Sequence, residues 1–337
     1  MILSIVYFIL ILILSYSFKK YKILSSYSGS LHQKFVNDPV TLSGGIFIFF
    51  PSMLLFFSGL NIIFIGCFSL IFFLGLLSDL NYLNKPKLRL FFQFLILVFF
   101  VLNLKVEVFP TRIYFIDDNF ENTYISYFFT VFCLLILING SNFIDGLNGL
   151  LLGYIVLILF FLIKLEFQNL VGVNITYFYQ FVFLLLFILV LNYFNLLFLG
   201  DNGSYSLSFT IGYFLIIIYN KLHFISPYFI ILLLWYPCFE NLFSIIRKSI
   251  YKSDPLNADN KHLHHYLYLF VKSKFNLNKL LTNNLTSIFI NLFNFIIFFI
   301  GSKYYSLTYI QILLILFCVT IYLLTYFILK KLVLYKI

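Results

Sequence analysis

Long apolar runs recur along this chain, and most of them approach the length that crosses a lipid bilayer. A membrane-spanning helix needs about 20 predominantly apolar residues. Of the 337 residues, 62% are hydrophobic and only 10% are charged, and the mean hydropathy is +1.02. Repeated apolar stretches of this length are typical of transmembrane segments. The sequence therefore predicts an all-α, polytopic integral membrane protein.

The polar breaks between these runs predict about eleven transmembrane helices. They are expected near residues 1–18, 44–60, 62–77, 89–104, 124–141, 147–164, 178–197, 203–220, 225–246, 284–301 and 307–329. The longest polar interval, from about Arg247 to Asn284, is too short to bury a core of its own. Residues 1–337 are therefore expected to form a single transmembrane domain, with 247–283 as a loop on one face.

Basic residues are divided unevenly between the two sides of the predicted membrane. All but five of the 22 lysines and arginines fall on one side, and the other side holds Lys105, Arg112, Lys164, Lys221 and Lys303. Cytoplasmic loops usually carry this excess, so the N-terminus is expected outside and the C-terminus in the cytoplasm. The net charge of +10 then reflects topology and contact with anionic membrane lipids. Nucleic acid is not an expected partner.

Chemically reactive side chains gather at the predicted cytoplasmic ends of the helices. They are Asp79, Asp145, Asp201, His262, His264 and His265. A charge inside a transmembrane segment costs about 2.5 to 3.5 kcal/mol, so it is usually kept for chemistry or transport. Carboxylates, a glycine-rich turn, basic residues and histidines facing one compartment suit a magnesium-assisted phosphoryl transfer, in which metal ions and fixed donors neutralise charge on phosphoryl oxygens.

The segments that carry these residues resemble a known family of membrane enzymes. In order they read GLLSDLNYLNKPKLR, NGSNFIDGLNGL, FLGDNGS and NADNKHLHHYL. Their order and flanks resemble the polyprenyl-phosphate N-acetylhexosamine-1-phosphate transferases, the MraY/WecA-type glycosyltransferase family 4, nearer its polysaccharide-initiating branch. The resemblance runs from about His32 to Leu267, and HQKFVNDPVTLSGG resembles the first cytoplasmic loop of the family.

The resemblance implies a reaction and its partners. A HexNAc-1-phosphate would pass from UDP-HexNAc to undecaprenyl phosphate, which releases UMP and starts a lipid-linked surface polysaccharide or O-antigen. The active site would face the cytoplasm at a bacterial inner membrane, within one catalytic domain whose cytoplasmic loop carries the histidines. Mg²⁺ is the implied cofactor, with Mn²⁺ as a second option. A homodimer is a further expected state of the protein.

The family motifs also imply a role for individual residues. The implied metal ligands are Asp201 and Asp145, and the implied catalytic residues are Asp79, Asp145, His264 and His265. The implied substrate-binding residues are Asn142, Gly146, Leu147, Asn148, Asn192, Phe198, His262, Lys85 and Arg89.

Ordinary structural roles remain open for several of these residues. Asp201 also suits the N-cap of a helix, and Lys85 and Arg89 also suit plain cytoplasmic flanking charge. The histidines also suit a structural helix end, whereas a zinc site would need further ligands that no nearby cysteine or glutamate supplies. Glu240, a carboxylate within a predicted span, suits a structural pair as well as a catalytic role.

Two positions depart from the family pattern. Ser78 stands where the family usually has an aspartate before Asp79, and Asn148 stands where many relatives have aspartate. Serine offers a hydrogen bond but no base at neutral pH. A phosphate nucleophile is already largely ionised there, so an active enzyme is still expected. The alternatives are a catalytically impaired scaffold of the same family, or a transporter with a carboxylate and histidine pathway.

Overall fold

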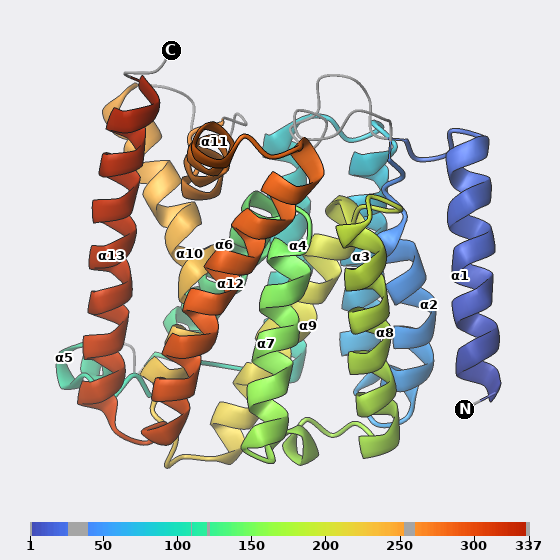
Figure 1. Ribbon diagram of the computed structural model, residues 1–337. Coiled ribbons are helices and arrows are strands. Elements are labelled where there is room, and N and C mark those ends of the chain that lie inside the picture. Colours follow the sequence, from blue (N-terminus) through green and yellow to red (C-terminus); the bar gives the residue numbers. More distant parts are fainter. Residues whose placement is uncertain (1, 26–39, 109, 120–121, 253–259, 335–337) are drawn as a thin grey trace.

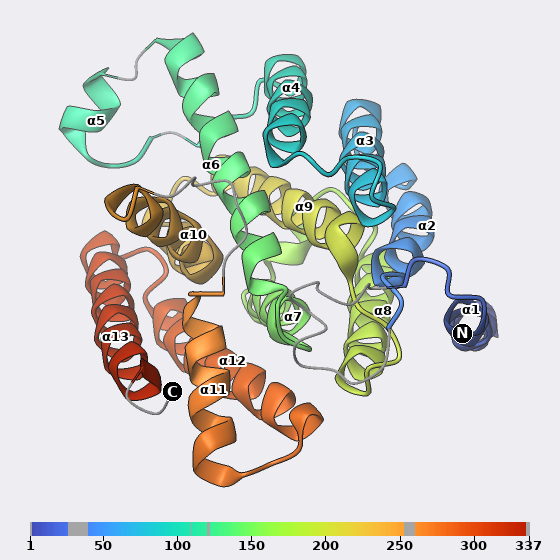
Figure 2. The same cartoon turned by 90° about the horizontal axis from the view of Figure 1, so that it is seen from above.

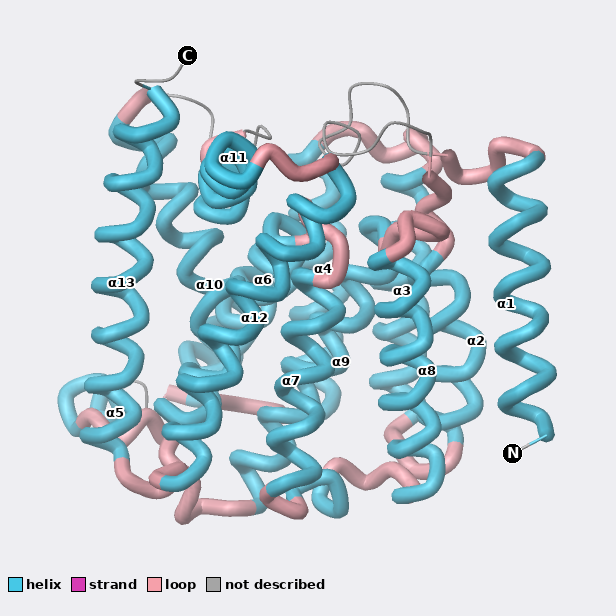
Figure 3. Tube along the Cα trace, in the orientation of Figure 1, coloured by secondary structure: helices cyan, strands magenta, loops and turns pink. Residues whose placement is uncertain are grey.

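The structure, a computed structural model, describes residues 2–25, 40–108, 110–119, 122–252 and 260–334. Within these ranges the chain consists of helices and loops, without a strand (Figure 3), which confirms the predicted all-α class. Most of HQKFVNDPVTLSGG lies outside the described residues.

Seven of the described helices are long and apolar enough to cross a membrane. They are α3 (Ile62–Asp79), α4 (Pro86–Leu104), α6 (Thr123–Ile144), α8 (Ile175–Tyr193), α10 (Pro227–Ile250), α12 (Lys279–Lys303) and α13 (Thr308–Leu334). The chain is therefore a membrane protein. The other helical segments are α1 (Ile2–Lys20), α2 (Gly44–Phe57), α5 (Tyr114–Asn119), α7 (Leu150–Lys164), the 3₁₀ helix η2 (Phe167–Leu170), α9 (Gly200–Lys221) and α11 (Leu263–Phe275).

Each of the eleven segments expected to span the membrane contains a helix. Several boundaries differ from the expected ones by a few residues, and two of them lie beside residues in the left-handed region. The helix expected from residue 147 begins at 150, and the one expected to reach 197 ends at 193. Residues in the left-handed region interrupt helices, and here Gly149 has φ 69° and Asn195 has φ 55°. The number of helices that cross the membrane, and the side each terminus faces, stay predictions. α1 begins and α13 ends at opposite ends of the bundle (Figure 1).

Helix α9 occupies the middle of the bundle when the structure is seen from above (Figure 2), and it packs against α2, α3 and α6. Nearly all of its residues are buried. Two glycines allow its first turn to approach α2 and α3. A Cβ at Gly75 of α3 would lie 2.5 Å from Cα of Asn202, and a Cβ at Gly45 of α2 would overlap the side chain of Asn202. The first turn of α9 is therefore packed closely against the backbones of α2 and α3.

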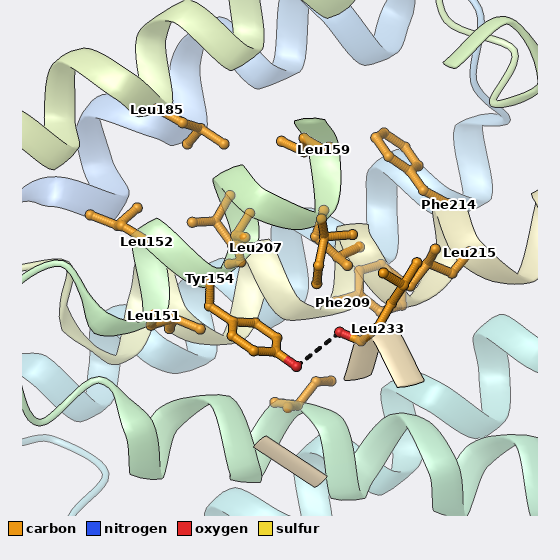
Figure 4. Close-up of a cluster of buried hydrophobic side chains, with 14 of the residues drawn as sticks. Leu151, Leu152, Tyr154, Leu159, Leu185, Leu207, Phe209, Phe214, Leu215 and Leu233 are labelled. Carbon is orange, nitrogen blue, oxygen red and sulfur yellow. Dashed lines mark hydrogen bonds between the residues drawn. The ribbon is translucent and has the colours of Figure 1, made fainter. Parts of the chain in front are cut away.

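Two polar side chains in the middle of the bundle form hydrogen bonds to neighbouring helices. Pro237 lies inside α10 and has no N–H, so it cannot bond the carbonyl of Leu233 one turn earlier. The hydroxyl of Tyr154 in α7 donates to that carbonyl oxygen at 3.0 Å instead (Figure 4). Trp235 Nε1 likewise donates to Asn294 Oδ1 at 2.8 Å. Such bonds satisfy polar groups that lipid cannot.

Helix α11 lies across the end of the bundle at which α13 ends (Figure 1), and it packs on α12 and α13. It begins directly after His262. The sequence predicted this stretch only as part of a polar loop. As a helix held on two others, it carries the histidines to a defined place over the bundle.

Candidate active site

The carboxylate of Asp79 caps the first turn of α9. Asp79 is the last residue of α3. Its Oδ1 accepts from the backbone N–H of Asp201 at 2.9 Å, and its Oδ2 accepts from the backbone N–H of Asn202 at 3.0 Å and from Asn202 Nδ2 at 2.5 Å. The first N–H groups of a helix lack partners within the helix, and a negative charge there is stabilised by the helix dipole. Asp79 thus fixes the start of α9, and its predicted role toward polyprenyl phosphate stays a prediction.

Asp201, in that first turn, is held by side chains from three other helices. Its Oδ2 accepts from Ser78 Oγ at 2.6 Å and from Arg89 Nη1 at 2.7 Å, and its Oδ1 accepts from Asn142 Nδ2 at 2.6 Å. Arg89 Nη1 also donates to Ser78 Oγ at 2.6 Å. About a quarter of each charged side chain is exposed, 25% for Arg89 and 22% for Asp201. The ion pair is therefore open to a charged ligand.

Asp145 follows the last residue of α6 and is half-buried. Burial, and then the charges of Asp201 and Asp79, raise the pKa of its carboxyl well above the usual aspartate range. Among the described residues, no side-chain hydrogen bond stabilises this carboxylate. A carboxyl group held beside two others without a donor of its own is destabilised when charged, and a bound cation would reverse that effect.

Two residues predicted to bind substrate, Asn148 and Asn192, form hydrogen bonds that fix the turn 146–149. Asn192 Oδ1 accepts from the backbone N–H of Gly149 at 2.6 Å, and its Nδ2 donates to the carbonyl of Leu197 at 2.9 Å. Asn148 Nδ2 donates to Asn195 Oδ1 at 2.5 Å. Both side chains are buried. Their geometry is that of residues which shape the turn, and direct contact with uridine stays a prediction.

Asparagines of α12 support the same turn, and the sequence analysis missed them. Asn283 Oδ1 accepts from the backbone N–H of Asn148 at 2.8 Å, and Asn291 Nδ2 donates to the carbonyl of Gly149 at 3.0 Å. Asn283, Ser287, Asn291 and Asn294 recur every three or four residues along this span. That spacing places them on one face of a helix, which is the signal that would have revealed them.

The histidines rest against the first glycine of the turn. A Cβ added to Gly146 would lie 2.9 Å from His264 Nε2 and 3.3 Å from His265 Nε2. The ring centroids of His264 and His265 are 4.3 Å apart, and those of His262 and His264 are 5.5 Å apart. Any side chain larger than glycine at 146 would push these rings away. The turn and the histidine segment therefore lie in contact, and the roles predicted for these residues stay predictions.

The remaining predicted residues lie at the edge of this group or behind it. Leu147 and Phe198 are buried, and the carbonyl of Phe198 accepts from the backbone N–H of Gly44 at 2.9 Å. Lys85 is exposed at the residue before α4 begins, one turn before Arg89. Substrate contacts by Leu147, Phe198 and Lys85 stay predictions.

The donor set suits a magnesium ion that is held only partly by protein. Within the described residues, no three His, Cys, Asp or Glu side chains converge as a ligand set. Mg²⁺ does not require such a set, because it is commonly held by one or two carboxylates, with waters and substrate phosphates completing its shell. Asp201 and the neighbouring Asp145, with its raised pKa, fit that kind of site.

A membrane-embedded helical bundle with carboxylates, a guanidinium and histidines gathered at one end has the features of an enzyme that handles phosphorylated lipids. Residues 60–219 match the family model described as Glycosyl transferase family 4. The match confirms the predicted family resemblance over this segment, and it supports a transferase of the polyprenyl-phosphate sugar-phosphate kind. No curated protein matches the chain. The matched segment includes Asp79, Asp145 and Asp201 but ends before the histidines.

Proposed function

We propose that this chain transfers a HexNAc-1-phosphate, GlcNAc-1-phosphate or a close relative, from its UDP-sugar to undecaprenyl phosphate. UMP would be released on the cytoplasmic side of a bacterial inner membrane, and the lipid product would start a surface polysaccharide or O-antigen. One observation supports this most directly. Asp145, Asp201 and the histidines come from distant parts of the sequence, yet Asp145 feels the charge of Asp201, and the histidines lie against the adjoining Gly146.

The proposed chemistry is a direct displacement at phosphorus. An oxygen of undecaprenyl phosphate attacks the sugar-proximal phosphorus of the UDP-sugar. A new P–O bond forms while the bond to the UMP oxygen breaks, and UMP leaves with that electron pair. Mg²⁺ held by Asp201 and Asp145, with Mn²⁺ as a second option, would neutralise charge on the diphosphate.

The side chains around Asp201 have roles that follow from their contacts. Asn142 donates to one carboxylate oxygen and fixes its orientation. Arg89 pairs with the other oxygen, and its planar guanidinium also matches phosphate geometry. A bound diphosphate or lipid phosphate would compete with Asp201 for Arg89. His264 and His265, which lie against Gly146, would donate hydrogen bonds to the diphosphate or the sugar.

The polar groups argue against a transporter. An ion pathway needs polar side chains throughout the membrane depth, whereas the two mid-bundle side chains Tyr154 and Asn294 bond to neighbouring helices. The proposed chemistry needs reactive polar side chains only at one end of the bundle.

The decisive experiment is a transfer assay with purified protein in nanodiscs, undecaprenyl phosphate and a panel of labelled UDP-HexNAc donors. Lipid product and UMP are scored with Mg²⁺, with Mn²⁺ and with EDTA. Asp201→Asn is expected to lower the rate by about 100-fold or more, as loss of a key electrostatic group does. Asp118→Asn, an exposed residue of α5, is the matched control.

Each outcome separates the proposal from its rivals. Near-normal UMP release by Asp201→Asn would overturn the metal assignment. Absence of lipid product with every donor would refute the proposed transferase activity. Ion flux in liposomes would then identify a transporter, and its absence a scaffold.

A further inference from the structure

A buried chain of hydrogen bonds runs from α13 through α10 to the histidine segment. Tyr322 Oη donates to Glu240 Oε2 at 2.8 Å, and Glu240 Oε1 lies 2.8 Å from His262 Nδ1. Tyr322 is 1% exposed, Glu240 is not exposed at all and His262 is 4% exposed. All three residues lie outside the segment that matches the family model.

The cost of burying Glu240 indicates what the residue does. A carboxylate without water is costly unless it is paired and its oxygens accept hydrogen bonds. Both oxygens of Glu240 have such a partner, one on α13 and one on the histidine segment. A neutral pair would tie these segments together at lower cost. The carboxylate therefore suits a purpose that needs its charge at the histidine ring.

His262 connects this buried pair to the site. Its ring lies nearly parallel to that of His264, with an interplanar angle of 11°. The ring of Phe143, two residues before Asp145, lies 5.3 Å away from it. A histidine has two distinct ring nitrogens, and the hydrogen bond at one decides the role of the other. A carboxylate at Nδ1 keeps a proton there and assigns Nε2 to other partners.

We propose that Glu240, anchored by Tyr322, is a positioning residue that holds a proton on Nδ1 of His262. Nε2 is then the ring nitrogen that contacts UDP-HexNAc: it accepts from a sugar hydroxyl when the ring is neutral, and it donates to the diphosphate when the ring is an imidazolium. The identity of this substrate rests on the proposed function. The hydrogen-bond chain and the position of the proton on His262 do not depend on that function.

The place of the proton is measured by solid-state NMR of the full chain in nanodiscs, with ¹⁵N-labelled histidine. His262→Gln identifies the signals of His262 among the five histidines. A protonated Nδ1 in the unaltered protein, lost or mixed in Glu240→Gln, is the expected result. A proton on Nε2 with a bare Nδ1 would mean that Glu240 itself is the donor, and it would overturn the proposal.

Kinetics then test whether the position of the proton matters for transfer. Glu240→Gln is expected to lower kcat per folded protein by about 100-fold, as a misplaced histidine tautomer or a lost partner of a ligating histidine does. KM for UDP-HexNAc should also rise, because Nε2 contacts this substrate, whereas KM for undecaprenyl phosphate should change by less than about three-fold. Tyr322→Phe, which removes one oxygen, should lower kcat by about three- to ten-fold.

Tyr326→Phe is the matched control. Tyr326 lies one turn further along α13 and stacks on Tyr322 with ring centroids 6.2 Å apart. Among the described residues, the side-chain hydrogen bonds of Glu240 go to His262 and Tyr322. Tyr326→Phe should therefore stay within about two-fold of the unaltered kcat. Equal effects of Tyr322→Phe and Tyr326→Phe would overturn the proposal.

The two readouts fail separately. A chain without transferase activity whose His262 still carries the Nδ1 proton would refute the proposed function and keep the positioning by Glu240. An active transferase in which the Nδ1 proton of His262 is absent, or unaffected by Glu240→Gln, would keep the proposed function and refute the positioning by Glu240.

Discussion

The cap that Asp79 places on α9 leads to a prediction about stability that a purely catalytic residue would not share. Asp79→Ala removes the acceptor of the backbone N–H groups of Asp201 and Asn202. A hydrogen bond to a charged group contributes about 1.5 to 3 kcal/mol, so the two together contribute about 3 to 6 kcal/mol. Asp79→Asn keeps one acceptor oxygen and should lose about half of that. The Asn202 side chain is not counted, because it also donates to the carbonyl of Leu42 at 3.3 Å.

The assay is unfolding by SDS in mixed micelles, followed through the fluorescence of Trp235, the one tryptophan of the chain. The free energy of unfolding should fall in the order unaltered, Asp79→Asn, Asp79→Ala, with Asp118→Asn as control. UMP release is measured on the same samples. An Asp79→Ala protein that unfolds like the unaltered one but releases no UMP would refute the capping role and leave Asp79 as a residue that acts on substrate.

Three further substitutions test the packing and the electrostatics of the site. Gly75→Ala places a Cβ 2.5 Å from Cα of Asn202 and should cost about 1 to 3 kcal/mol in SDS unfolding, whereas Gly66→Ala in the same helix meets nothing within 4 Å and should not destabilise. The raised pKa of Asp145 means that folding stability falls as pH rises from the ordinary aspartate range through that raised value. Asp145→Asn should therefore raise the unfolding midpoint at neutral pH and leave it unchanged in acid. An equal effect at both pH values would contradict a stability loss that comes from ionisation of Asp145. Ser78→Asp puts a carboxylate where a hydroxyl lies 2.6 Å from Asp201 Oδ2, so it should lower thermal stability in EDTA and enlarge the shift that Mg²⁺ produces.

The sequence predicted the helices because membrane thickness sets their length. A run of apolar residues between polar breaks has few other structures open to it in lipid, and every expected segment does contain a helix. The boundaries near residues 147 and 197 failed because Leu147 and Leu197 are apolar residues in turns. The backbone beside them is fixed by asparagine side chains, which composition does not reveal. Asn283 of α12 accepts from the N–H of Asn148, and Asn192 of α8 donates to the carbonyl of Leu197.

The side chains of the site could be predicted as a group but not in their individual contacts. Asp79 and Asp201 look alike in the sequence, since both are aspartates at helix ends. Their difference arises because α3 and α9 meet at Gly75, which turns one carboxylate toward the N–H groups of the other's helix. That meeting joins residues more than a hundred positions apart. The local sequence pattern therefore cannot predict the contact between α3 and α9.

The replacement of an aspartate by Ser78 is the feature that made activity hardest to foresee, and its contacts show how a site can work with it. The Ser78 hydroxyl bonds to the same oxygen of Asp201 that Arg89 holds. A carboxylate in that place would compete with Asp201 for the guanidinium. It would also add a fourth carboxylate to Asp79, Asp145 and Asp201, where burial and then the charges of Asp201 and Asp79 already raise the pKa of Asp145. With serine, Asp201 alone pairs with Arg89, and the Ser78 hydroxyl accepts from Arg89 and holds it in place. A degenerating scaffold would have no reason to keep this network closed around Asp201. The network therefore favours an enzyme in which Arg89 and Ser78 have taken over part of the role of the missing carboxylate.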